Sequence, residues 1–162
     1  MHPFRRRLIL AFVFASAALF VATASAQPDQ RSFGTWKLNV TKSKYTPGPA
    51  PQSLIVKWEP AGKGGVWLTA EGIGPDGKPF KATYTANYDG KDYPYVGSPA
   101  FDTISLRRID TNTVERTDKK AGKVVQVLTR VMAKDGKSFT VTAKGTTAKG
   151  EPIHNVTVFE KQ

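Results

Sequence analysis

The sequence predicts an all-β protein, a single antiparallel up-and-down β-barrel of about eight to ten strands. Short stretches in which apolar and polar residues alternate follow one another along the chain, joined by tight turns that contain glycine. No segment after residue 26 shows a helical period. The alternating segments 33–38 and 156–161 lie at opposite ends of this region and are expected to pair. Pairing of the first and last strands favours closure of the sheet.

A signal helix is predicted over residues 1–26, ahead of a barrel domain at residues 27–162. Arg5–Arg7 give a positive start, an almost unbroken apolar run covers residues 8–24, and Ala24-Ser25-Ala26 supplies the small residues of a cleavage site. The run is shorter than the ~20 residues of a spanning helix, so we expect cleavage after Ala26 and no membrane span in the mature protein. The protein is therefore expected in the periplasm or the extracellular medium.

The positive charge of the chain has two interpretations. The formal net charge is +11, which is compatible with a nucleic-acid or anionic surface. A nucleic-acid surface, however, gathers its cations with stacking aromatic residues on one face. Here many lysines fall in expected turns, where they keep a sheet protein soluble, and we predict no nucleic-acid partner. These lysines are Lys63, Lys78, Lys91, Lys119, Lys120, Lys123, Lys134, Lys137 and Lys149.

The first strand is expected over residues 33–40, with Trp36, Leu38 and Val40 on its buried face. The polar residues 27–32 before it are expected to fray. Residues 41–52 contain three prolines, which exclude a helix interior and a central strand, so an extended loop is predicted over one end of the barrel. This loop could equally be a simple connector.

The next three strands have clear alternation. Residues 53–59 place Leu54, Val56 and Trp58 on one face, and the strand after the glycine turn does the same with Val66, Leu68 and Ala70. Residues 74–77 are a strong turn signal. The strand at 79–88 has the cleanest pattern of all, and its buried face is expected to carry Phe80, Ala82, Tyr84, Ala86 and Tyr88.

The second half of the chain continues in the same manner. Residues 91–101 form an aromatic loop that could contain one short strand. Five further strands follow, separated by short turns that suit hairpins between sequence neighbours, which makes nine or ten strands in all. These five are expected at residues 102–109, 113–117, 123–132, 138–144 and 153–160.

The two ends of the domain resemble a known family. Phe33-Gly34-Thr35-Trp36-Lys37-Leu38 and Val158-Phe159-Glu160-Lys161 look like the ends of intracellular lipid-binding proteins of the fatty-acid-binding type, within the calycin superfamily. Gly34-Thr35-Trp36 is also similar to the Gly-x-Trp opening of lipocalins and avidins. The chain further resembles a group of small secreted bacterial lipocalin-like proteins. The resemblance implies a calycin-like barrel in which Gly34 and Trp36 are structural residues.

The resemblance and the residue pattern disagree about Arg130. The fatty-acid-binding pattern holds a ligand carboxylate with an inward arginine, and Arg130 matches it, whereas Thr157 and Phe159 replace the other two members of that site. On the expected strand around Arg130, however, the valines at 125, 127 and 131 make the more apolar face, which predicts that Arg130 points outward. Arg108 is in phase with Ile104 and Leu106 and is the other candidate inward charge.

No catalytic or metal motif is present. The chain has no cysteine, and His154 is the one histidine after residue 26, whereas a zinc site of the usual kind needs several such ligands. Gly136-Lys137-Ser138 lacks the earlier glycine of a phosphate-binding loop. Glu71 and Glu115 fall on the polar faces of their strands. We therefore predict no enzyme activity, no metal and no cofactor.

The predicted function is that of an exported protein that holds a small, largely apolar molecule, lipid-like or aromatic, in the lumen of its barrel. The alternative is a periplasmic interaction or inhibitor module whose barrel is filled and binds no small ligand. An open lumen favours the first and a solid core the second; a protein partner is not predicted. The residues expected to line the lumen are Trp58, Leu68, Phe80, Ala82, Tyr84, Tyr88, Leu106, Arg108 and Arg130.

Overall fold

The computed structural model describes residues 29–62 and 64–162, so the predicted signal helix and its cleavage site lie outside the described residues. The described part forms ten strands and one short 3₁₀ helix, η1, at Gln30–Ser32. The strands are β1 (Gly34–Lys44), β2 (Ser53–Ala61), β3 (Gly65–Ile73), β4 (Pro79–Asn87), β5 (Tyr93–Val96), β6 (Thr103–Arg108), β7 (Thr113–Lys120), β8 (Lys123–Met132), β9 (Ser138–Thr146) and β10 (Pro152–Lys161).

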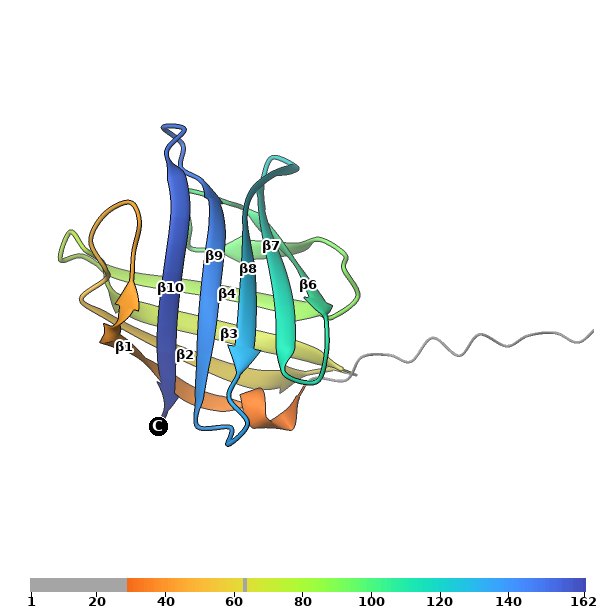
Figure 1. Ribbon diagram of the computed structural model, residues 1–162. Coiled ribbons are helices and arrows are strands. Elements are labelled where there is room, and N and C mark those ends of the chain that lie inside the picture. Colours follow the sequence, from red (N-terminus) through yellow and green to blue (C-terminus); the bar gives the residue numbers. More distant parts are fainter. Residues whose placement is uncertain (1–28, 63) are drawn as a thin grey trace, which may run out of the picture.

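The strands close into a barrel in which each strand pairs antiparallel with its sequence neighbours (Figure 1). The closing pair joins the first strand to the last, with Trp36 opposite Lys161 and Leu38 opposite Phe159. The predicted antiparallel up-and-down barrel is therefore confirmed. The aromatic loop supplies β5, the shortest strand, and this brings the number of strands to the upper end of the predicted range.

An aromatic cluster fills one end of the barrel. Trp36 is fully buried and meets Phe139 edge to face at 4.8 Å. Phe139 also stacks on Trp58 at 5.1 Å and on Phe159 at 4.8 Å between ring centroids. Aromatic pairs of this kind contribute more than their buried area alone. Because the cluster joins β1, β2, β9 and β10, it holds the closing seam of the barrel together.

The residues before β1 cap this end and are not frayed, which corrects the prediction for residues 29–32. Asp29 accepts a hydrogen bond from the backbone N–H of Arg31 at the start of η1. The indole Nε1 of Trp36 donates to the carbonyl oxygen of Ser32 at 2.8 Å, and Ser32 is completely buried. An aspartate before a helical turn is a recognised capping signal. The prediction of a frayed segment relied on its polar composition and did not use this signal.

Strand β1 is longer than predicted, and its second half turns away from the core. The strand reaches Lys44, but the pairing with β10 shifts between Asn39 and Lys44, as in a β-bulge. Ser43 fills this irregularity: its Oγ donates to the carbonyl of Asn39 and accepts from the backbone N–H of Val158. The bulge breaks the alternation, so Val40 is 39% exposed and the prediction that it is buried is wrong.

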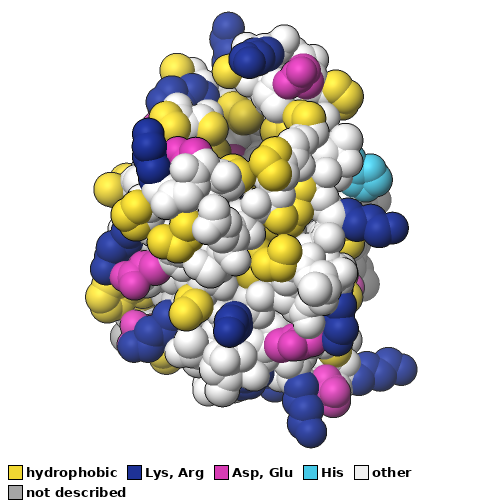
Figure 2. Space-filling view, turned by 90° about the vertical axis from the view of Figure 1, so that its left-hand side faces the viewer, with side chains coloured by type: hydrophobic (Ala, Val, Ile, Leu, Met, Phe, Trp, Pro, Cys, Tyr) yellow, Lys and Arg dark blue, Asp and Glu magenta, His cyan; other side chains and the backbone are white. Residues whose placement is uncertain are grey.

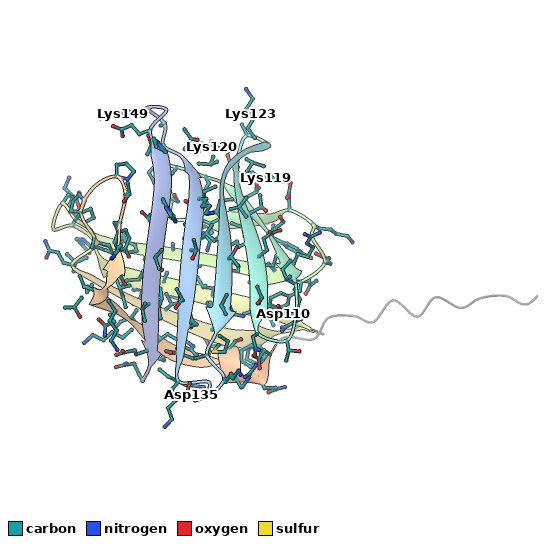
Figure 3. All side chains as sticks on the ribbon, in the orientation of Figure 1. Asp110, Lys119, Lys120, Lys123, Asp135 and Lys149 are labelled. Atoms are coloured by element: carbon teal, nitrogen blue, oxygen red, sulfur yellow. The ribbon has the colours of Figure 1, made fainter. Side chains whose placement is uncertain are left out.

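The hairpins alternate between the two ends of the barrel. Figure 3 shows Lys120, Lys123 and Lys149 near the tips of the β7–β8 and β9–β10 hairpins at one end, and Asp110 and Asp135 in the turns at the other. Some lysines at the first end are paired, since Lys119 Nζ lies 2.7 Å from Asp92 Oδ1. No helix within the described residues has the length and apolar character needed to cross a membrane.

Candidate ligand-binding lumen

The interior of the barrel contains two adjacent cavities. The inner chamber has a volume of about 70 Å³ and the outer chamber about 230 Å³. Both are lined mainly by apolar and aromatic side chains. Each is smaller than the roughly 300–1,000 Å³ of usual small-molecule sites, and only the two together reach the lower end of that range. Five residues line both chambers and mark the boundary between them: Trp58, Leu68, Arg116, Leu128 and Val141.

The outer chamber reaches the rim of the barrel. Its lining includes Tyr45, from the start of the β1–β2 loop, and Phe80, from the start of β4. Phe80 is 36% exposed although it is in phase with the buried residues of β4, because it stands at the end of the barrel. Figure 2 looks at the side that carries the β1–β2 and β3–β4 loops, and it shows a hollow with hydrophobic side chains around it. Tyr45 and Phe80 adjoin these two loops and therefore lie toward this side.

Arg130 lines the inner chamber, and the prediction from the valine face of this strand is wrong. Its side chain is only 7% exposed, whereas Val131 is 46% exposed on the outer surface. Arg130 lies opposite the buried Val114 of β7, and cross-strand partners share a face. The pairing between β7 and β8 is continuous from Gln126 to Val131, so the alternation holds there, and the more apolar face of the strand is the outer one.

Among the described residues, Arg130 has no acidic partner in contact. Its guanidinium carbon lies 4.0 Å from the centre of the Trp58 ring, and Nη1 donates to Ser32 Oγ at 3.0 Å. Burial lowers the pKa of Arg130 below its usual value. An arginine nevertheless stays protonated at neutral pH, so the inner chamber contains a cation that has lost most of its water.

Two further side chains offer buried donors. The indole N–H of Trp58, which lines both chambers, has no hydrogen-bond partner among the described residues. Nε and Nη2 of Arg108 are likewise buried without a described partner, and its guanidinium lies over the ring of Tyr88 at 5.1 Å. Buried polar groups that lack a partner are unusual and costly. An acceptor group on a ligand in the inner chamber would satisfy the donor on Trp58.

The sequence analysis missed a polar cluster built on Asp118. This carboxylate is completely buried and accepts hydrogen bonds from Arg116 Nε at 2.6 Å and Nη2 at 2.8 Å. Gln126 Nε2 donates to the same carboxylate at 2.6 Å. Burial acts against the charge of Arg116, but Asp118 outweighs it and raises the pKa of Arg116. Arg116 therefore stays protonated, but the negative charge of Asp118 balances its positive charge.

An aromatic cage surrounds the guanidinium of Arg116. The ring centroids of Tyr84, Tyr95 and Phe101 lie 5.7, 5.3 and 5.5 Å from its central carbon. Cation–π contacts of this length are favourable, and more so away from water. A signal for this site was available, because Val114, Arg116 and Asp118 are spaced two apart and so share one face of a strand. Because two of these three residues are charged, the sequence pattern indicated that this face of the strand is exposed to solvent.

Most residues predicted to line the lumen do so. The inner chamber is lined by Trp58, Leu68, Tyr84, Tyr88, Leu106 and Arg130, and Phe80 stands at the rim of the outer one. Two residues differ. Ala82 is buried but lines neither chamber. Arg108, at the end of β6, has buried guanidinium nitrogens and contacts Tyr88, but it is not part of either chamber wall. Gly34 has a φ of 119°, which favours glycine at the start of β1.

The chemistry of the described interior is that of binding. No three His, Asp or Glu side chains in the described ranges are grouped closely enough to hold a metal ion. The charged side chains in the walls of the two chambers are Arg116 and Arg130. Arginine does not lose its proton in proteins, so it is suited to holding an anion and poorly suited to moving protons.

Comparisons with known proteins add little about function. No protein-family model matches the chain, and no curated protein matches it. Among solved structures the chain is similar to one described as a redesigned β-barrel, with 14% sequence identity and a TM-score of 0.49. That match covers 86% of this chain and 99% of the other. A likeness at this level carries no information about a ligand.

Proposed function

We propose that this protein binds a small amphipathic organic anion in the lumen of its barrel, with a lipid-like or aromatic body. The observation that carries the proposal is the juxtaposition in the inner chamber of Arg130, a buried cation, with the unpartnered indole N–H of Trp58. An anionic group would give both donors an acceptor. The apolar outer chamber would take the body of the ligand, which enters past Tyr45 and Phe80.

The energetics of Arg130 support an anion over a neutral ligand. Taking a charged side chain out of water costs several kcal/mol, and stacking on Trp58 with one hydrogen bond to a serine returns only part of this. A charge-assisted hydrogen bond to an anion is roughly twice as strong as a neutral one. The site therefore holds a cation for which an anionic ligand supplies the missing partner.

The alternative of a filled interaction module has less support. A filled barrel would leave no space beside Arg130, whereas the inner chamber, which Arg130 lines, has a volume of about 70 Å³ and adjoins the outer chamber of about 230 Å³. Catalysis also has less support than binding, because the chamber walls carry arginines without an acid–base pair. The calycin resemblance is compatible with ligand binding. We further propose that the mature protein begins after Ala26 and acts outside the cytoplasm, which N-terminal sequencing of the soluble envelope fraction would test.

Calorimetric titration with two anions of different shape tests the binding proposal. Dodecanoate represents a lipid-like ligand and naphthoate an aromatic one, and at least one should bind in the lumen and quench Trp58 fluorescence. Arg130→Met should abolish that binding. Arg107→Met is the matched control, because Arg107 belongs to the barrel wall but its side chain is 68% exposed. If neither anion binds, or if both variants bind as the wild type does, the proposal is wrong.

A further inference from the structure

Asp118 lies behind Arg116 and does not itself line either chamber. All three of its recorded hydrogen bonds come from side chains, two from Arg116 and one from Gln126. Both carboxylate oxygens are therefore occupied, and the arrangement with Arg116 is bidentate. This geometry fixes the guanidinium as well as neutralising it.

Two cations thus face the lumen with different electrostatic character. Arg130 has no acidic side chain in contact in the part of the chain that the structure describes, whereas the charge of Arg116 is balanced by Asp118 at 2.6 Å. The interior has a low effective dielectric, so an added or missing charge at this depth has a large effect. A ligand with one negative group finds one unbalanced cation. A second negative group would meet a neutral pair and would lose its water without a counter-charge.

We propose that Asp118 determines the charge selectivity of the lumen: by neutralising Arg116 it restricts the site to ligands that carry a single negative charge and excludes dianions. This inference rests on the proposed function, because it concerns the same lumen. It assigns Asp118 the role of a positioning residue that acts through Arg116 and has no contact with the ligand. The pair also places a fixed, neutral, hydrogen-bonding wall at the boundary of the two chambers.

Matched pairs of probes separate this role from a purely structural one. The monoanions dodecanoate and naphthoate are compared by isothermal calorimetry with dicarboxylates whose second carboxylate lies close to the first, octylsuccinate and naphthalenedicarboxylate. The wild type should bind a monoanion and bind the matched dianion at least about tenfold more weakly, since an unpaired buried charge forfeits roughly that much. In Asp118→Asn the amide no longer balances Arg116, and the preference should shift toward the dianion by about tenfold or more.

A second comparison covers the case in which Asp118→Asn does not fold. Arg116→Met combined with Asp118→Leu removes the pair without leaving a lone charge, which is often tolerated. This double variant should keep monoanion binding and reject the dianion. Arg116→Met alone leaves an unbalanced carboxylate near the ligand and should bind the monoanion about tenfold or more weakly than the double variant.

The outcomes distinguish the two proposals. Wild type that binds none of the four probes overturns the proposed function and this inference together. Wild type that binds a monoanion, with an unchanged preference in Asp118→Asn, overturns the charge-selectivity role alone. Equal binding of monoanion and dianion by the wild type also overturns the charge-selectivity role alone. Loss of all binding in the double variant would mean that Arg116 itself holds the anion, and it would also contradict the inference.

Discussion

The guanidinium carbon of Arg130 lies 4.0 Å from the centroid of the Trp58 ring, and this contact places a cation against an aromatic face inside the barrel. The same indole has a buried N–H without a described partner. The two residues come from β2 and β8, strands that are not neighbours in the sheet. The lumen therefore brings together a cation that lacks an anionic partner and an N–H that lacks a hydrogen-bond acceptor, and a ligand could supply both.

The first prediction is that Arg130→Met does not destabilise the ligand-free protein. Replacing a buried charged group by an apolar one of similar volume is often neutral or stabilising by about 1–4 kcal/mol. Denaturant unfolding measures this, with the exposed Arg107→Met as a control for loss of surface charge. A loss of more than about 3 kcal/mol in Arg130→Met would mean that Arg130 is a structural residue and would contradict its reading as a binding residue.

Trp36→Ala should strongly destabilise the domain or unfold it. The side chain is fully buried, its N–H is bonded to Ser32, and its ring meets Phe139 at the closing seam. Truncating a buried tryptophan costs roughly 3–5 kcal/mol. Trp67→Ala is the control, since Trp67 is 47% exposed on the outer face of β3 and should cost far less. Equal urea midpoints for the two variants would show that the seam is not part of the core.

The sequence was sufficient for the fold because alternation and turn chemistry act locally. Strands such as β2, β3 and β4 carry an uninterrupted period of two, so their inward residues follow from the pattern. The pattern misled where a register shift intervenes. Bulges after Asn39 and after Asp118 are properties of strand pairs, and a single strand's sequence does not report them. Val40 was mispredicted for this reason.

The buried polar cluster was missed for a different reason. Counting apolar residues on a strand assumes that the inner face is the more apolar one, and that holds only when buried charges are absent. Strand β8 instead exposes Val131 and turns Arg130 and the partly buried Gln126 inward. These side chains are retained by contacts with Trp58 and Asp118, which come from other strands. Only the assembled barrel shows those contacts.

Alkaline pH should weaken the fold partly through Tyr84. Burial raises the pKa of Tyr84 to about 12, compared with ~10 in an unfolded chain. The folded state therefore keeps a proton that the unfolded state loses. Stability from this group is complete below about pH 10 and falls as the pH rises toward 12, by up to ~1.4 kcal/mol per pH unit.

Tyr84→Phe isolates this contribution, because it removes the ionisable hydroxyl, whose pKa is raised chiefly by burial, and retains the ring. Denaturant unfolding between pH 9 and pH 12 should show a smaller loss of stability in Tyr84→Phe than in the wild type. The two curves should differ by roughly 2 kcal/mol at pH 12. Parallel curves would mean that Tyr84 ionises in the folded protein as it does in water.

The last prediction tests the outer chamber with two alanines that face each other. Ala70 on β3 is the register partner of Ala82 on β4, and both are buried. Ala70 lines the outer chamber, whereas Ala82 lines neither chamber.

Ala70→Leu should therefore fill empty space and change the unfolding free energy little, while it weakens binding of dodecanoate or naphthoate. Ala82 adjoins neither chamber, so Ala82→Leu should destabilise the protein by roughly 1–3 kcal/mol through overpacking. Denaturant unfolding and calorimetry on both variants measure the two effects. If Ala70→Leu is as destabilising as Ala82→Leu and leaves ligand affinity unchanged, the outer chamber is packed in solution and does not hold the ligand.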